Sequence, residues 1–221
     1  MKAKYPNESN EYRAARNLLL QAEVELREKT EAVAVLRRAM PLGGEVPEDY
    51  VFHNLENERT KLSELFADHD TLLLYSYMFG PEMTEPCSMC TSILDGLESS
   101  LPTISNRCAF AAVISGSIEQ ANDVYQRKSW KNLTLLSAKS NTYNRDYFGE
   151  LEDGSQIPMM NVFTRKNENI YHFWGSELVF EPAQGDPRHM DLLWPLWNAL
   201  DLTPSGRGEE YPSVDGLIGN R

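Results

Sequence analysis

Residues 71–90 read TLLLYSYMFGPEMTEPCSMC, and this stretch decides the fold. The apolar run over 71–79 is typical of a β-strand that is buried on both faces. A Gly-Pro pair ends the strand, and a helical pattern continues after the cysteines to about Leu101. The sequence therefore places Cys87 and Cys90 where a buried strand ends and a helix begins.

Strands and helices alternate downstream of this junction. Residues 108–114 and 133–137 have the pattern of two more strands, and Ser117 is the expected N-cap of a helix between them. This alternation predicts right-handed crossovers on a parallel sheet. The later elements are a hairpin, with strands at 159–164 and 170–174 around a turn at 166–169, and a helix from Asp191 to Asp201 with Pro195 in its first turn. We therefore expect an α/β fold with a mixed central sheet flanked by helices.

A long helix is expected ahead of this domain, from its N-cap Ser9 to Met40. Apolar residues recur every seven positions and form a narrow stripe: Tyr12, Leu19, Leu26, Val33 and Met40. The stripe either packs on its own domain or forms a homodimer contact.

Three parts of the chain follow from these patterns. They are a helical extension over 1–44, an α/β domain over 45–202 and an extended tail over 203–221. At the start of the domain, a short strand is expected at 50–52 and helical turns at 61–66.

The composition limits the partners and the compartment. The 221 residues include 21 Lys and Arg against 33 Asp and Glu, a formal net charge of −12. Such a chain repels phosphate backbones and anionic lipids, so we expect neither nucleic acid nor membrane as a partner. No apolar run approaches the ~20 residues of a membrane span, and the first residues lack the apolar core of a secretory signal. The expected location is the cytoplasm.

Two of the three cysteines point to thiol chemistry. Unpaired N–H groups and partial positive charge at a helix N-terminus favour a thiolate, which makes Cys87 the candidate nucleophile. Cys90 lies one turn further on the same helix face and is the candidate resolving thiol. The expected reaction is thiol–disulfide exchange with a disulfide-containing protein or a small thiol substrate.

Other interpretations of the cysteines remain open. The pair could be buried and inert, or could hold zinc if His172 and His189 completed the site. Three cysteines are too few for an iron–sulfur cluster within one chain. We expect no metal and no organic cofactor, and we expect Cys108 to act as a small buried apolar residue.

The order of elements around the motif resembles that of thioredoxin. Ile157-Pro158, followed by an apolar strand, is similar to the Ile-Pro of that family. The resemblance implies a cis proline that faces the thiols and a preceding backbone group that pairs with substrate, roles that fall on Pro158 and Ile157. The chain departs from thioredoxin in having Pro86 before the motif and Tyr75-Ser-Tyr77 where thioredoxin buries an aspartate.

A closer resemblance covers nearly the whole chain. It is carried by these segments: Tyr75-Ser-Tyr-Met-Phe-Gly-Pro81, Cys87-Ser-Met-Cys90, Asn141-Thr-Tyr-Asn-Arg-Asp-Tyr147, Tyr171-His-Phe173 and Leu200-Asp-Leu-Thr-Pro-Ser-Gly-Arg207. They are similar to a thioredoxin-like bacterial family of unknown function whose members are described as dithiol–disulfide oxidoreductases. The resemblance implies a thioredoxin-like fold with an added N-terminal helix.

Two rival functions use the same fold. Peroxiredoxins carry Pro-x-x-x-Thr-x-x-Cys, and Pro81, Thr84 and Cys87 match this pattern one residue short. The Thr84 hydroxyl would then contact peroxide or the Cys87 sulfur, with Arg145 or Arg165 as the activating arginine.

The second rival is a protein-binding scaffold without enzyme activity. Its partner surface would be a cluster of exposed aromatic residues: Phe173, Trp174, Trp194 and Trp197.

Overall fold

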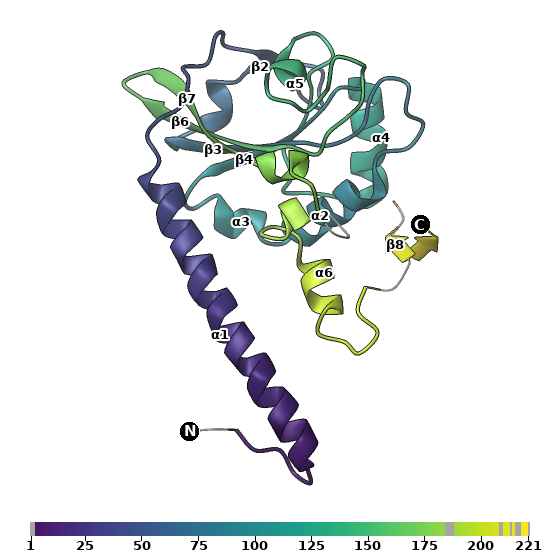
Figure 1. The fold of residues 1–221 in the computed structure, drawn as a ribbon. Coiled ribbons are helices and arrows are strands. Elements are labelled where there is room, and N and C mark those ends of the chain that lie inside the picture. The colour runs from purple at the N-terminus through teal and green to yellow at the C-terminus, as the bar shows by residue number, and fades with distance from the viewer. Residues whose placement is uncertain (1–2, 184–187, 208–209, 213, 215–217, 221) are drawn as a thin grey trace. The chain divides into compact units, whose positions relative to one another are not determined.

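A computed structural model of the chain describes residues 3–183, 188–207, 210–212, 214 and 218–220. The chain forms two compact units, Met1–Pro41 and Leu42–Arg221. Figure 1 draws both units and labels many of their helices and strands. The expected boundaries at residues 44 and 202 stay predictions.

The first unit is the expected long helix, α1 (Asn10–Ala39). The Ser9 side chain accepts a hydrogen bond from the Tyr12 backbone N–H, which confirms Ser9 as the N-cap. No side chain of α1 is buried, and Leu19 and Leu26 of the apolar stripe are exposed. Across the described ranges, no helix has both the length and the apolar character needed to cross a membrane.

The second unit is built on a seven-stranded sheet with the order β2-β1-β5-β4-β3-β6-β7. Its strands are β1 (Val51–His53), β2 (Arg59–Lys61), β3 (Thr71–Ser76), β4 (Ala109–Ile114), β5 (Leu135–Ser137), β6 (Met160–Lys166) and β7 (Asn169–Gly175). The strands β3, β4 and β5 are parallel, whereas β6 and β7 form an antiparallel hairpin beside β3. This topology confirms the expected thioredoxin-like mixed sheet, which β1 and β2 extend at one edge.

Short and long helices connect these strands. They are η1 (Glu64–Phe66), α2 (Ser88–Glu98), α3 (Leu101–Ile104), α4 (Ile118–Lys128), α5 (Tyr143–Asp146), η2 (Glu177–Phe180), η3 (Arg188–Met190) and α6 (Pro195–Leu200). Ser117 caps α4 and forms a reciprocal capping box with Gln120.

The last helix differs from the prediction, because it begins at Pro195 and not at Asp191. Proline fits the first helical position, where its missing N–H is not needed, and the preceding segment forms the separate turn η3. The tail contains a strand pair, β8 (Glu210–Pro212) and β9 (Ile218–Asn220), where only an extended chain was expected.

The sheet separates two apolar layers, as Figure 1 shows for α2 and α5. Alternate residues of β4 point to opposite faces, so Ala112 packs with α2, α4 and α6 while Val113 packs with β1 and α5. Tyr75 and Cys90 belong to the first layer, and Tyr143 belongs to the second. The central strands are therefore buried on both faces, as their continuous apolar runs predicted.

Residues 43–46 run along the outer edge of β7. The Gly43 N–H donates to the His172 carbonyl at 2.9 Å, and the His172 N–H donates to the Gly44 carbonyl at 2.9 Å. The Val46 N–H donates to the Ile170 carbonyl at 2.8 Å. A Cβ at Gly43 would lie 2.6 Å from the His172 oxygen, so only glycine permits this close approach.

Candidate functional site

Cys87 lies at the N-terminus of α2, where it is the N-cap residue. Its backbone N–H donates to the Met78 carbonyl at 2.9 Å, which ties the cysteine to the chain just beyond β3. Its sulfur lies 3.5 Å from the Cys90 backbone nitrogen, which donates to it. The predicted position of this cysteine at a strand–helix junction is thereby confirmed.

The environment of Cys87 favours its thiolate. The Cys90 side chain donates a hydrogen bond to it, and the backbone N–H groups of Cys90 and Met89 add to the effect. Together they outweigh burial and lower the pKa of the Cys87 thiol to about 6. The side chain is only partly buried. Cys87 therefore combines thiolate character with access from solvent.

Cys90 has the opposite environment. It is 1% exposed and packs in the apolar layer beneath α2. Burial, together with the neighbouring Cys87 sulfur, raises the pKa of its thiol well above the usual value. Both thiols are free in the structure. The pair is thus divided into an accessible thiolate and a buried thiol that donates to it.

Two hydroxyl groups that the sequence analysis missed hold the Cys87 backbone. The Thr91 hydroxyl donates to the Cys87 carbonyl at 2.8 Å. It lies 2.7 Å from the Tyr77 hydroxyl, which must be the donor of that second hydrogen bond because Thr91 has already used its own hydrogen. Both groups are buried. This relay ties the first turn of α2 to the chain just after β3.

Tyr75 lies beneath the second thiol. Its side chain is fully buried, and its hydroxyl has no hydrogen-bond partner of normal geometry among the described residues. Burial raises the pKa of the Tyr75 hydroxyl well above its usual value. Among its neighbours, the Cys90 sulfur adds most to this rise. The pKa of Cys90 is raised overall by its burial, and the Tyr75 hydroxyl opposes a small part of this rise. Tyr75 belongs to the segment Tyr75-Ser-Tyr77, which stands where thioredoxin buries an aspartate.

The proline expected to face the thiols does not have the expected geometry. No peptide bond within the described residues is cis, so the expectation for Ile157-Pro158 is wrong. The Met159 N–H donates to the Ile157 carbonyl at 2.9 Å, and this tight turn is centred on Pro158. The Ile157 N–H donates to the Gly149 carbonyl at 3.0 Å, so both backbone groups of Ile157 already have partners. A role of these two residues in a substrate groove stays a prediction.

The structure locates the residues expected for peroxide chemistry, and their role at Cys87 stays a prediction. Thr84 is exposed in the loop before α2. Arg145 pairs with Glu150 at 3.2 Å. Arg165 donates to the His69 carbonyl at 2.8 Å, near the start of β3 and so at the end of that strand away from Cys87.

The remaining candidates are also located. Cys108 is half-buried, and burial raises the pKa of its thiol, which fits an unreactive group. Trp194 and Trp197 are buried at 2% and 3% exposure, so the exposed aromatic surface predicted for the scaffold function is wrong for these two. Within the part of the chain that the structure describes, no group of three or more His, Cys, Asp or Glu side chains is placed to hold a metal ion.

Comparison with known proteins gives a family and a set of fold relatives. The model of a family described as "Bacterial protein of unknown function (DUF899)" matches residues 1–218. No curated protein matches the chain.

Solved structures with partial similarity include two peroxiredoxins and a thioredoxin. The peroxidoxin BcpB of Mycobacterium tuberculosis is 17% identical with a TM-score of 0.48, over 73% of this chain and 98% of that one. Peroxiredoxin Q of Xanthomonas campestris is 14% identical with a TM-score of 0.47, over 71% and 96%. The exposed lipoprotein thioredoxin Etrx1 of Streptococcus pneumoniae is 14% identical with a TM-score of 0.42, over 66% and 96%.

Proposed function

The chain belongs to this bacterial family of unknown function (DUF899), and we propose that it is a thiol–disulfide oxidoreductase that works through Cys87 and Cys90. One observation carries the proposal. An accessible sulfur at a helix N-terminus accepts hydrogen bonds from the backbone and the thiol of a buried cysteine one turn away. No cofactor is required, because the two thiols supply both electrons of the exchange.

In the first step the Cys87 thiolate attacks one sulfur of a substrate disulfide. The substrate S–S bond breaks, a mixed disulfide with Cys87 forms, and the second substrate sulfur leaves as a thiolate that takes a proton from water. The lowered pKa of Cys87 supplies the thiolate at neutral pH. The relay from Tyr77 through Thr91 holds the nucleophile at the helix end during attack.

In the second step Cys90 loses its proton and attacks the Cys87 sulfur. The mixed disulfide breaks, a Cys87–Cys90 disulfide forms, and the substrate leaves as its second thiolate, which takes up the proton that Cys90 lost. The substrate disulfide has then gained two electrons from the protein dithiol. Burial opposes ionisation of Cys90, and the Tyr75 hydroxyl beneath it favours the thiolate. Tyr75 is therefore proposed as a positioning residue for the resolving step.

The substrate class is a disulfide-containing protein or a small disulfide, and the cytoplasm is the proposed location. A homodimer contact through α1 is part of the same proposal. The exposed apolar stripe of α1 supports that contact, because its seven-residue period suits pairing with a second copy.

The test is reduction of insulin by the purified full chain with dithiothreitol as electron donor. We expect catalysis above the dithiothreitol background and its loss in Cys87→Ser. Cys108→Ser is the matched control, because it removes a free thiol outside the site, and it should retain the full rate. Hydrogen peroxide consumption is measured in parallel. Peroxide turnover without disulfide reduction would assign the peroxidase function instead, and inactivity toward both would contradict the proposal.

A further inference from the structure

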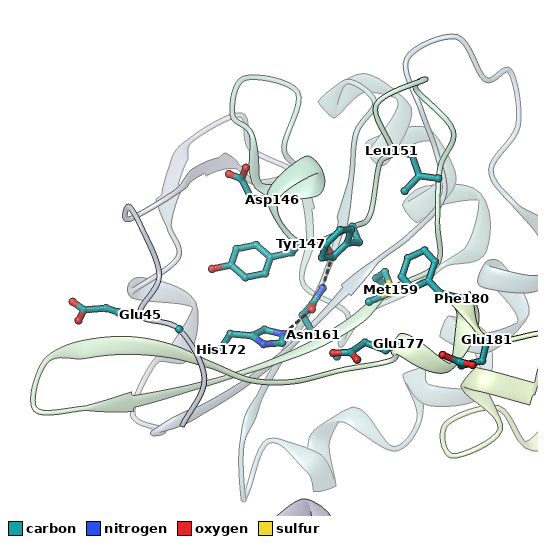
Figure 2. Close-up of a pocket in the computed structure, with 13 residues that line it drawn as sticks. Glu45, Asp146, Tyr147, Leu151, Met159, Asn161, His172, Glu177, Phe180 and Glu181 are labelled. Carbon is teal, nitrogen blue, oxygen red and sulfur yellow. Dashed lines mark hydrogen bonds between the residues drawn. The ribbon is translucent and has the colours of Figure 1, made fainter. Parts of the chain in front are cut away.

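A second site lies on the other face of the sheet. A cavity of about 740 Å³ is lined in part by Leu151, Met159, Asn161, Glu177, Phe180 and Glu181. Figure 2 shows Phe180 next to Met159, with Leu151 on one side of this pair and Glu177 and Glu181 on the other. This volume is within the range of cavities that hold small-molecule ligands. Its walls come from segments far apart in the sequence, which is why sequence analysis did not find it.

The cavity is separate from the thiols. Met160 packs in the same apolar layer as Cys90. Successive residues of a strand point to opposite faces, so Asn161, the next residue of β6, points away from that layer. A ligand in the cavity and a substrate at Cys87 would therefore occupy opposite faces of the sheet.

Aromatic and aliphatic side chains form much of the cavity wall. Tyr147, Phe148 and Phe180 contribute rings, and Leu151 and Met159 contribute aliphatic surface. The rings of Phe148 and Phe180 lie 5.9 Å apart, edge to face, although the two side chains are 56% and 47% exposed. Phe148 has a φ of +58°, which is unfavourable for a bulky residue. The fold thus holds a large apolar ring at the cavity wall, partly open to water, at a cost in backbone energy.

The charged groups of the cavity are all acidic. Among the described residues of the wall, the charged ones are Glu45, Asp146, Glu177 and Glu181, and none is a lysine or arginine. Asp146 accepts hydrogen bonds from two hydroxyl groups, but none of the three glutamates forms an ion pair with another described residue. Their negative potential excludes anionic ligands and attracts cations.

One end of the cavity offers a neutral hydrogen-bond acceptor. The Asn161 amide nitrogen donates to the Tyr147 carbonyl at 3.1 Å, so its oxygen faces His172 Nε2 at 3.0 Å. An oxygen can only accept, so Nε2 carries the hydrogen and Nδ1 keeps a free lone pair. Burial lowers the pKa of His172, although the charge of Glu177 opposes this effect, so the neutral ring is favoured.

We propose that this cavity binds a small organic cation, a protonated amine attached to an aromatic body. The aromatic body would contact Tyr147, Phe148 and Phe180, and the ammonium group would lie near Glu177 and Glu181. The rings and the glutamates both favour a cationic ligand, because the faces of aromatic rings also attract cations. A neutral analogue would keep only the apolar contacts, and an anionic analogue would be repelled.

The test uses three indole probes of similar size that differ in charge. They are tryptamine, which is a cation at pH 7, tryptophol, which is neutral, and indole-3-propionate, which is an anion. Binding to the full chain is measured by isothermal titration calorimetry at low and high salt. We expect tryptamine to bind at least tenfold more tightly than tryptophol, with an affinity that falls as salt rises, and indole-3-propionate not to bind.

Variants assign the binding to this cavity. The double variant Glu177→Gln with Glu181→Gln should weaken tryptamine binding about tenfold and leave tryptophol binding unchanged. Leu151→Trp fills the cavity without changing its charge and should weaken both. Glu56→Gln, an exposed acid outside the cavity, is the matched control and should change neither.

Two sets of results would overturn the proposal. One is equal binding of all three probes or binding of none. The other is tryptamine binding that both cavity variants leave intact while their circular dichroism and thermal melting match those of the unmodified chain. Insulin reduction by the same samples is independent of this result, so the thiol function and the cavity are judged separately.

Discussion

The backbone N–H of Cys90 points at the sulfur of Cys87 from 3.5 Å, while the Cys90 side chain is buried directly behind it. One residue therefore supplies two hydrogen bonds to the nucleophile and is also its proposed resolving partner. The two properties can be separated, because a substitution of the Cys90 side chain removes its thiol but keeps its backbone N–H. Two variants, Cys90→Ala and Cys90→Ser, make use of that difference.

The first prediction concerns the acidity of Cys87. Alkylation by iodoacetamide should follow thiolate formation with a midpoint near pH 6, because the pKa of Cys87 is lowered to about 6. Cys90→Ala should move the midpoint upward, since the Cys90 side chain is the largest cause of the lowering. The backbone donors that remain should keep it below the ordinary thiol value of about 8.5. A midpoint at or above that value in the unmodified chain would contradict thiolate activation.

The second prediction concerns the resolving step. Cys90→Ser should accumulate a mixed disulfide between Cys87 and substrate, because no second thiol attacks it. Intact-mass spectrometry after incubation with oxidised glutathione should show one added glutathione. Cys108→Ser should show no accumulation, because both thiols of the site remain. Equal accumulation in these two variants would remove the resolving role from Cys90.

The third prediction concerns the Tyr75 hydroxyl. Tyr75→Phe should slow release of the substrate thiol from the mixed disulfide by about tenfold, the effect of raising the pKa of Cys90 by about one unit. The loss should shrink as pH rises, and alkylation of Cys87 should keep its pH midpoint. Tyr143→Phe is the control, since Tyr143 is equally buried with an unpartnered hydroxyl but lies in the other apolar layer. Stopped-flow release of a fluorescent thiol measures both rates. If the two variants slow release equally, the role of Tyr75 is structural only.

The fourth prediction concerns the relay behind the nucleophile. Thr91→Val keeps the shape of a fully buried side chain but removes the hydrogen bond to the Cys87 carbonyl and the acceptor for Tyr77. The free energy of unfolding in urea should fall by about 1–3 kcal/mol, the cost of leaving buried polar groups unpaired. Thr134→Val, at an exposed position, should stay within about 0.5 kcal/mol of the unmodified chain. A loss no larger than that of the control would show that the relay adds no stability.

The fifth prediction concerns α1. A homodimer through its stripe should appear in light scattering as twice the chain mass of 25.2 kDa. Leu19→Glu with Leu26→Glu should give the monomer, because like charges would face one another along the paired stripes. Leu18→Glu, an equally exposed leucine outside the seven-residue repeat, should leave the dimer intact. A monomeric unmodified chain would remove the homodimer from the proposal.

Local signals in the sequence were sufficient for most of the fold. Ser9 and Ser117 are placed by short-range capping, and the buried strands by continuous apolar runs. The hairpin turn was also predictable from Lys166-Asn-Glu-Asn169. In the structure Asn167 and Glu168 both adopt the positive φ values of a tight two-residue turn. The Cys87-x-x-Cys90 spacing placed the thiols because their geometry is that of a single helical turn.

Features that depend on distant parts of the chain were not predictable in this way. The trans peptide before Pro158 is part of a turn tied to Gly149, and no local pattern reveals that contact. The position of Tyr75 beneath Cys90 depends on how α2 packs on β3. The cavity combines residues from β6, the loop after α5 and η2, so it exists only in the folded sheet.

The strip formed by residues 43–46 has a consequence for solubility. An uncovered edge strand presents unpaired N–H and C=O groups that can recruit strands from other molecules. Here Gly43, Gly44 and Val46 already occupy such groups on β7. Truncated chains that begin after Val46 should therefore aggregate through β7, whereas chains that begin at Leu42 should stay dispersed. The few residues that follow the long helix thus prevent other molecules from adding strands to β7.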